Sequence, residues 1–164
     1  MIAEDGTITN GDFLCMGASG ETTKIISLAI RKHGRLDLTA HGNSMFPFIR
    51  EGDVCRFVSF DSLLLKKGDI AVFYSLDGNI IAHRLCQFKL INNELCYVFK
   101  GDTSIGYDEP VRKKQIIGKL IWIRKGTMIY RAEGWAPQLW GRLILTLPVL
   151  SLLLRTYLKG KANT

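Results

Sequence analysis

The sequence lacks the cysteine and histidine patterns that bind structural zinc. Its 164 residues contain four cysteines, yet none forms a Cys-x-x-Cys pair and no His-x-x-x-His pattern follows, which argues against a zinc site. Apart from Cys15, the cysteines lie in apolar, strand-like runs. We interpret Cys55, Cys86 and Cys96 as reduced residues of the core.

Targeting and nucleic-acid signals are also missing. Residues 1–20 are polar and rich in glycine, with no basic-then-apolar leader, so we expect a flexible arm and no cleavable signal peptide. The formal net charge is +7, but no nucleic-acid fold signature accompanies it. We therefore expect no nucleic-acid partner, and we interpret Arg112-Lys113-Lys114 as part of a solvated basic face. There is no internal repeat and no low-complexity tract.

What is present is the composition of a globular protein, with 47% hydrophobic and 23% charged residues. An apolar face within residues 21–33, followed by Gly34, predicts a short helix. From Arg35 the apolar period changes to two, and turn signals such as Asp77-Gly78-Asn79 and Asn92-Asn93 separate the runs. Strands are predicted at residues 36–40, 54–60, 70–74, 80–90, 95–99, 115–124 and 127–131. This pattern indicates a mainly β, antiparallel and coiled architecture over residues 21–134.

Residues 135–164 form an apolar tail. The run from Leu143 to Leu154 is interrupted only by Thr146, Pro148 and Ser151, and Pro148 should kink or divide a helix there. As a helix the run spans about 18 Å, against roughly 30 Å for a bilayer core. Three interpretations remain open: a helix at the membrane surface, a helix packed on protein, and a strained membrane span.

We favour contact with a membrane surface through residues 139–158, and hence a membrane-associated location whose side the sequence leaves open. In that arrangement Trp135, Trp140 and Tyr157 would lie at the level of the lipid headgroups, with Arg155 and Lys159 near lipid phosphate.

A candidate nucleophile lies in His41-Gly42-Asn43-Ser44-Met45-Phe46-Pro47. Gly42 and Pro47 shape the chain on either side of Ser44, and the apolar residues between them can anchor the turn in a core. His83 follows in a strand-like run, and Asp102 follows the next one at a glycine turn. A serine needs a base and the base needs an orienting group, so this set suits nucleophilic catalysis.

Five boxes in fixed order resemble the type I signal peptidases. They are Gly42-Asn43-Ser44-Met45-Phe46-Pro47, Glu51-Gly52-Asp53-Val54, Lys67-Gly68-Asp69-Ile70, Ala82-His83-Arg84-Leu85, and Lys100-Gly101-Asp102 with Asp108 beyond. The resemblance extends from about Leu36 to Ile123. It is to the endoplasmic-reticulum and archaeal-like branch, in which a histidine stands where bacterial relatives carry a lysine.

The resemblance implies a coiled antiparallel signal-peptidase/LexA-like β fold and a serine endopeptidase that cuts a leader or signal segment from a precursor polypeptide. Ser44 would be the nucleophile and His83 the general base. Asp102 would orient the imidazole, although Asp108 matches a second acidic position of the family and is the alternative. The oxyanion would be held by backbone N–H groups near Ser44. The extended substrate would bind by β-addition. No cofactor or metal is implied.

Two departures and two alternative functions accompany this interpretation. The chain shows no N-terminal membrane anchor, and its tail is a poor span. A LexA-like self-cleaving regulatory module is one alternative, but such repressors resemble the lysine branch and usually carry a DNA-binding module and an Ala-Gly cleavage site, whereas this chain has His83 and neither feature. The other alternative is a non-catalytic scaffold. The catalytic interpretation predicts that Ser44 Oγ and His83 lie within hydrogen-bond reach.

Overall fold

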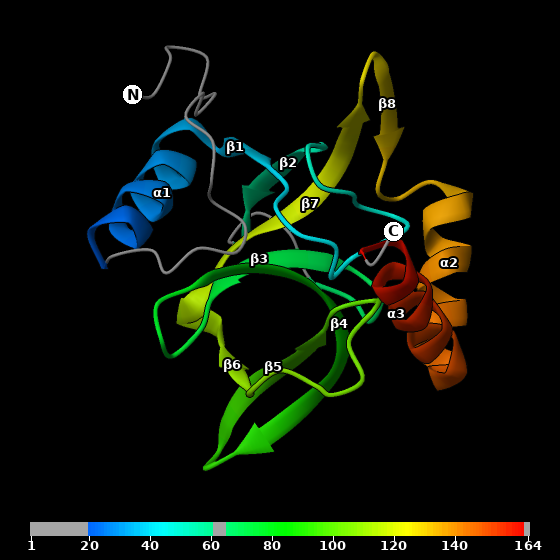
Figure 1. Cartoon of the computed structure of the whole chain (residues 1–164). Coiled ribbons are helices and arrows are strands. Elements are labelled where there is room, and N and C mark those ends of the chain that lie inside the picture. Colours follow the sequence, from blue (N-terminus) through cyan, green and yellow to red (C-terminus); the bar gives the residue numbers. More distant parts are fainter. Residues whose placement is uncertain (1–19, 61–64, 163–164) are drawn as a thin grey trace.

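A computed structural model describes residues 20–60 and 65–162 as one antiparallel sheet of eight strands with three α-helices (Figure 1). The mainly β, antiparallel architecture predicted from the sequence is thus confirmed. The predicted arm at residues 1–20 and Cys15 lie outside the described residues, except for Gly20, which begins the first helix.

The helices and strands follow the predicted segments closely. In chain order they are α1 (Gly20–His33), β1 (Arg35–Thr39), β2 (Val54–Ser59), β3 (Ile70–Tyr74), β4 (Ile80–Ile91), β5 (Glu94–Lys100), β6 (Val111–Arg112), the short 3-10 helix η2 (Lys113–Gln115), β7 (Ile116–Lys125), β8 (Met128–Arg131), α2 (Trp135–Thr146) and α3 (Pro148–Ala162). The strand order is β1-β2-β7-β3-β4-β5-β6, and β8 pairs with β7.

Local sequence explains the turns between strands. Asn92 and Asn93 both have positive φ, at 51° and 60°, which is the conformation of a two-residue hairpin turn between β4 and β5. The strand β6 was not predicted, because two residues are too few to establish a period.

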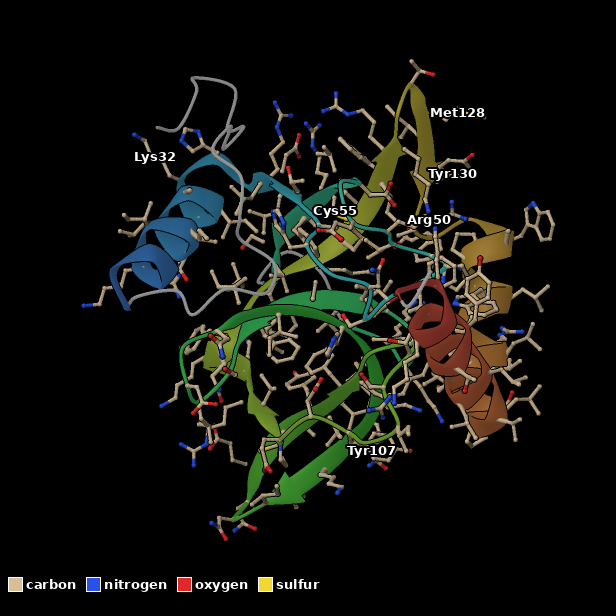
Figure 2. All side chains as sticks on the ribbon, in the orientation of Figure 1. Lys32, Arg50, Cys55, Tyr107, Met128 and Tyr130 are labelled. Atoms are coloured by element: carbon tan, nitrogen blue, oxygen red, sulfur yellow. The ribbon has the colours of Figure 1, made fainter. Side chains whose placement is uncertain are left out.

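Two apolar cores lie on opposite faces of the central strands. Along β3 and β4, Val72 and Ala82 belong to the core beneath α1, whereas Phe73 and Leu85 belong to the core enclosed by β5 and β6. Because side chains alternate along a strand, neighbouring residues of β4 reach different cores. Figure 2 shows the side chains that fill both regions and those left outside, such as Tyr107, Met128 and Tyr130, which are exposed.

The tail forms two helices on the side of the sheet away from α1 (Figure 1). Helix α2 ends at Thr146 and α3 begins at Pro148, so the predicted break at this proline is confirmed. The angle between the two helices is 100°. Within residues 20–60 and 65–162, no single helix meets the length and hydropathy expected of a membrane span, while the bent pair meets them only when its two helices are taken together.

Candidate active site

The segment that carries Ser44 is a turn anchored on both sides. Two hydrogen bonds fix the start of this segment just after β1. Ala40 N donates to Asp53 O (2.8 Å), and Gly52 N donates to Ala40 O (2.9 Å). Gly42 has a φ of +73°, which side-chain-bearing residues rarely adopt. Beyond Ser44, the buried Met45 accepts a hydrogen bond from Ile49 N through its carbonyl oxygen at 2.9 Å. The apolar residues therefore anchor the turn and leave Ser44 partly exposed.

Ser44, His83 and Asp108 form a continuous hydrogen-bonded chain. The Ser44 Oγ lies 3.0 Å from His83 Nε2, and His83 Nδ1 lies 2.7 Å from an oxygen of Asp108. The predicted proximity of Ser44 and His83 is thus confirmed. The short Nδ1 contact assigns the ring proton to Nδ1, which donates to the carboxylate and leaves Nε2 able to accept the hydroxyl proton.

The sheet and its core fix the position of His83. The residue lies on β4 opposite Ala71 of β3, and it is 8% exposed. The ring of the buried Phe73 meets the imidazole edge-on, with ring centroids 6.5 Å apart. A histidine held by a strand ladder and an aromatic wall has little rotational freedom, which favours a fixed hydrogen-bond direction toward Ser44.

Asp102 does not contact His83, contrary to the prediction that it orients the imidazole. Its two oxygens accept hydrogen bonds from Arg84 Nε (2.8 Å) and Nη2 (2.7 Å), and a third from Trp140 Nε1 (2.8 Å). The side chains of Asp102 and Arg84 are almost completely buried, at 1% and 3% exposed. The reason lies in β4: Arg84 follows His83 and therefore points to the other face of the strand. Trp140, expected at the lipid headgroups, instead points toward the domain.

The loop that begins with Asp102 nevertheless supports the nucleophile. Thr103 donates to the carbonyl oxygen of Ser44 through its backbone N–H at 2.9 Å and its hydroxyl at 3.2 Å. Gly101 passes so close that a β-carbon there would lie 2.9 Å from that oxygen and 3.0 Å from His83 Nε2. Only glycine fits between the two site residues at this position.

Sequence reasoning missed the roles of Gly101, Arg84 and Trp140. The first two belong to boxes that carry the family resemblance, so the boxes were a usable signal for them. No local signal marked Trp140, because its partner Asp102 is 38 residues away in the chain.

Two buried groups of the central strands are neutral or paired. Burial raises the pKa of the Cys86 thiol to about 11, so it is protonated at neutral pH. Burial alone would lower the pKa of Lys119, but hydrogen bonds and charge from Asp69 and Glu133 outweigh it and raise the pKa. Both carboxylates lie 3.1 Å from Lys119 Nζ, so this lysine ties the turn before β3 to the segment that precedes α2.

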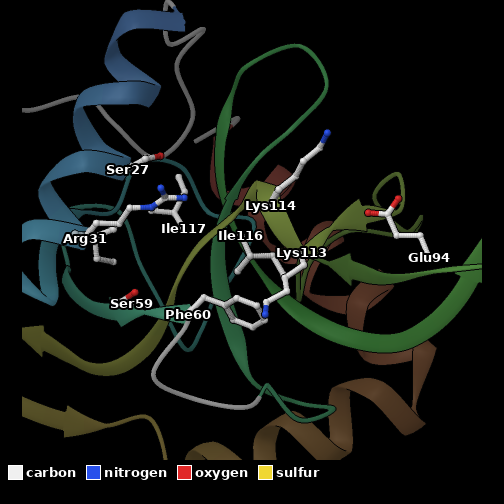
Figure 3. A pocket seen from close by; sticks show the side chains of 10 residues that line it. Ser27, Arg31, Ser59, Phe60, Glu94, Lys113, Lys114, Ile116 and Ile117 are labelled. Carbon is white, nitrogen blue, oxygen red and sulfur yellow. The ribbon is translucent and has the colours of Figure 1, made fainter.

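Two clefts lie outside the Ser44–His83 pair. One, of about 310 Å³, is bounded by α1, the start of β7 and Phe60 (Figure 3). The other, of about 700 Å³, separates α2 from the turn at residues 66–69, and Arg84 and Lys119 contribute to its wall. Neither is lined by Ser44, His83 or Asp108.

Among residues 20–60 and 65–162, no cluster of three or more His, Cys, Asp or Glu side chains is arranged to hold a metal ion. No protein-family model and no curated protein matches the chain.

Proposed function

We propose that the protein is a serine endopeptidase of signal-peptidase type, which cuts a leader or signal segment from a precursor polypeptide. The observation that carries the proposal is the hydrogen-bonded chain from Ser44 through His83 to Asp108, with distances of 3.0 and 2.7 Å. These three residues come from three separate segments and meet at one point, as a nucleophile, its base and an orienting carboxylate must.

In the proposed mechanism Ser44 Oγ attacks the scissile carbonyl while His83 Nε2 accepts its proton. Asp108 holds the imidazole through Nδ1 and stabilises the imidazolium that forms. The same imidazolium then donates its proton to the leaving amine, and water hydrolyses the acyl-enzyme. Within the described residues, the backbone N–H of Ser44 has no acceptor, so it is available as an oxyanion donor.

The proposal places the extended substrate on two strand edges that have no partner strand among the described residues. Strand β1, which leads to Ser44, pairs only with β2 in the described part of the chain. Strand β4 pairs with β3 from Ile80 to Arg84, but its pairing with β5 starts at Arg84. In the described part of the chain, the side of residues 80–83 that faces away from β3 therefore leads to His83 without a partner strand. Substrate backbone can add to such edges by hydrogen bonding.

The order of the five boxes and the antiparallel sheet support the finer assignment to the signal-peptidase/LexA-like fold. In this assignment the Ser-His pairing belongs to the endoplasmic-reticulum and archaeal-like branch. The bidentate contact between Arg84 and Asp102 supplies a structural role for the acidic residue that the resemblance assigns to the site.

The test uses a mixture of unstructured peptides from a digested proteome, because the natural substrate is unidentified. The purified chain is incubated with the mixture, and new amino termini are identified by mass spectrometry. Ser44→Ala and His83→Ala should each abolish the products, and the double variant should be no worse than either single one, because the two residues act as a unit. Cleavage should also fall at acid pH, since a protonated imidazole cannot accept the serine proton.

The same samples separate the competing functions. New termini that persist in Ser44→Ala would contradict the proposed nucleophile. Cleavage of the chain itself, read by its intact mass and lost in Ser44→Ala, would favour a self-cleaving module. Absence of all cleavage with a folded chain would favour a scaffold.

A further inference from the structure

The inner face of the tail contacts the domain at three places. Trp140 of α2 donates to Asp102, and Ser151 of α3 lies 3.1 Å from Lys100 Nζ. The ring of Tyr157 stacks on Phe46 with centroids 5.9 Å apart. The tail therefore packs on the loop that carries Ser44 and on the end of β5 with the loop that follows it.

The opposite face of the tail is apolar and exposed. We call it the outer apolar face, and it consists of Trp135, Leu139, Leu143, Leu147, Val149, Leu152 and Leu153. Trp135 is 81% exposed and Val149 is 63% exposed. In α2 the residues at 135, 139 and 143 are four apart and share one stripe, opposite the buried Ile144. A soluble protein rarely leaves so many large apolar side chains on one pair of helices exposed to water.

The charged residues of the tail indicate what kind of partner covers the outer apolar face. Residues 135–164 contain no Asp or Glu, and their cations are Arg142, Arg155, Lys159 and Lys161. Exposed cations beside apolar side chains complement a surface of anionic lipid. A second copy of this chain fits less well, because a two-fold contact through this face would set its cations against those of the partner.

We propose that the outer apolar face docks on a bilayer that contains anionic lipid, with α2 and α3 lying in the membrane surface. A span is disfavoured by the contacts of the inner face. Insertion of α2 would withdraw the indole of Trp140 from Asp102, and insertion of α3 would withdraw Ser151 from Lys100. The bend of 100° also prevents the two helices from forming one straight span.

Docking in this orientation brings Ser44 close to the lipid surface, because Phe46 lies two residues from Ser44 and contacts α3 through Tyr157. The docking itself does not rest on the proposed peptidase function. It can be measured with Ser44→Ala in the full-length chain, so that no proteolysis intervenes.

The experiment mixes this full chain with vesicles of phosphatidylcholine, with or without phosphatidylglycerol. We expect sedimentation with the anionic vesicles, weakened by salt, and a blue shift of tryptophan emission that Trp135→Phe removes. Replacing Arg155 and Lys159 by Gln should weaken binding by about fivefold per cation.

Matched variants test the face itself. Leu139→Ser with Leu153→Ser should reduce binding by about tenfold or more per substitution. The control is Leu90→Ser with Leu95→Ser on the β4–β5 hairpin, because these leucines are similarly exposed, at 70% and 48% against 50% and 60%. The control should bind like the parent. Circular dichroism verifies that each variant is folded.

Four results would overturn the proposal. The first is a parent chain that stays monomeric and does not bind the vesicles. The second is equal vesicle binding by the tail variant and the control variant. The third is a dimer in sedimentation velocity without vesicles that only the tail variants dissociate, which would identify a second copy as the occupant. The fourth is vesicle binding that resists alkaline carbonate extraction, which would identify a span.

Discussion

Replacing each aspartate near the site by asparagine separates the two roles that the structure gives them. Asp108→Asn removes the charge that holds His83 Nδ1 at 2.7 Å while keeping the size of the side chain. A hydrogen bond to a charged group contributes about 1.5–3 kcal/mol, which corresponds to a loss of about 10- to 150-fold in kcat/KM. The loss should exceed this range if the amide also stabilises the wrong imidazole tautomer. Asp108 is partly exposed, so the free energy of unfolding should change little.

Asp102→Asn should act on stability instead. Its carboxylate is buried against Arg84 and also accepts from Trp140, so removing the charge leaves a buried guanidinium without its counter-ion. Breaking a buried ion pair costs about 3–5 kcal/mol. For a chain of this length, that loss lowers the unfolding temperature by roughly 6–20 °C.

The assay measures kcat/KM on a peptide identified by the mass-spectrometric screen, together with thermal unfolding followed by circular dichroism. Each variant thus serves as the control for the other. Our reasoning fails if Asp108→Asn keeps full activity while Asp102→Asn abolishes it at unchanged stability. That result would return Asp102 to the role of orienting the imidazole.

Other contacts make further predictions. Trp140→Phe keeps the aromatic packing but loses one hydrogen bond to the buried Asp102, so thermal unfolding should show a loss of about 1.5–3 kcal/mol. Gly101→Ala places a methyl group 3.0 Å from His83 Nε2, and peptide cleavage should fall more than about tenfold in a chain whose circular dichroism is unchanged. Because the pKa of Lys119 is raised in the folded state above its ordinary value of 10.5, its contribution to stability is present below that pH and is lost above it. Urea titrations above pH 10.5 should therefore show a steeper loss for the wild type than for Lys119→Met.

The sequence predicted most of the fold because its period and turn chemistry agree locally. The alternation after Arg35, the Asn92-Asn93 turn and the break at Pro148 each depend on neighbouring residues, and the structure has a strand, a hairpin and a helix boundary at these places. The Ser44–His83 contact was predicted from the order of the family boxes, since no local pattern shows that residues 39 apart will meet.

The choice between the two aspartates could not be made from the sequence. Asp102 and Asp108 lie in the same connection between β5 and β6, and either one is close enough in sequence to face the imidazole. What decides between them is the path of this loop in space. That path depends on the buried Arg84 and on Trp140 from the tail, both of which hold Asp102 away from His83.

A consequence of β4 concerns insertions and deletions. His83 and Arg84 are consecutive, so the strand presents a titratable ring on one side and a permanent cation on the other. Shortening β4 by one residue between its turn and His83 would move Arg84 into the place of His83 if the downstream pairing moved with it. Ser44 would then face a guanidinium, which cannot accept a proton, and the tail would lose its buried anchor in the same event. Length changes in this strand are therefore forbidden in single steps, whereas a shift of two residues preserves the alternation of faces.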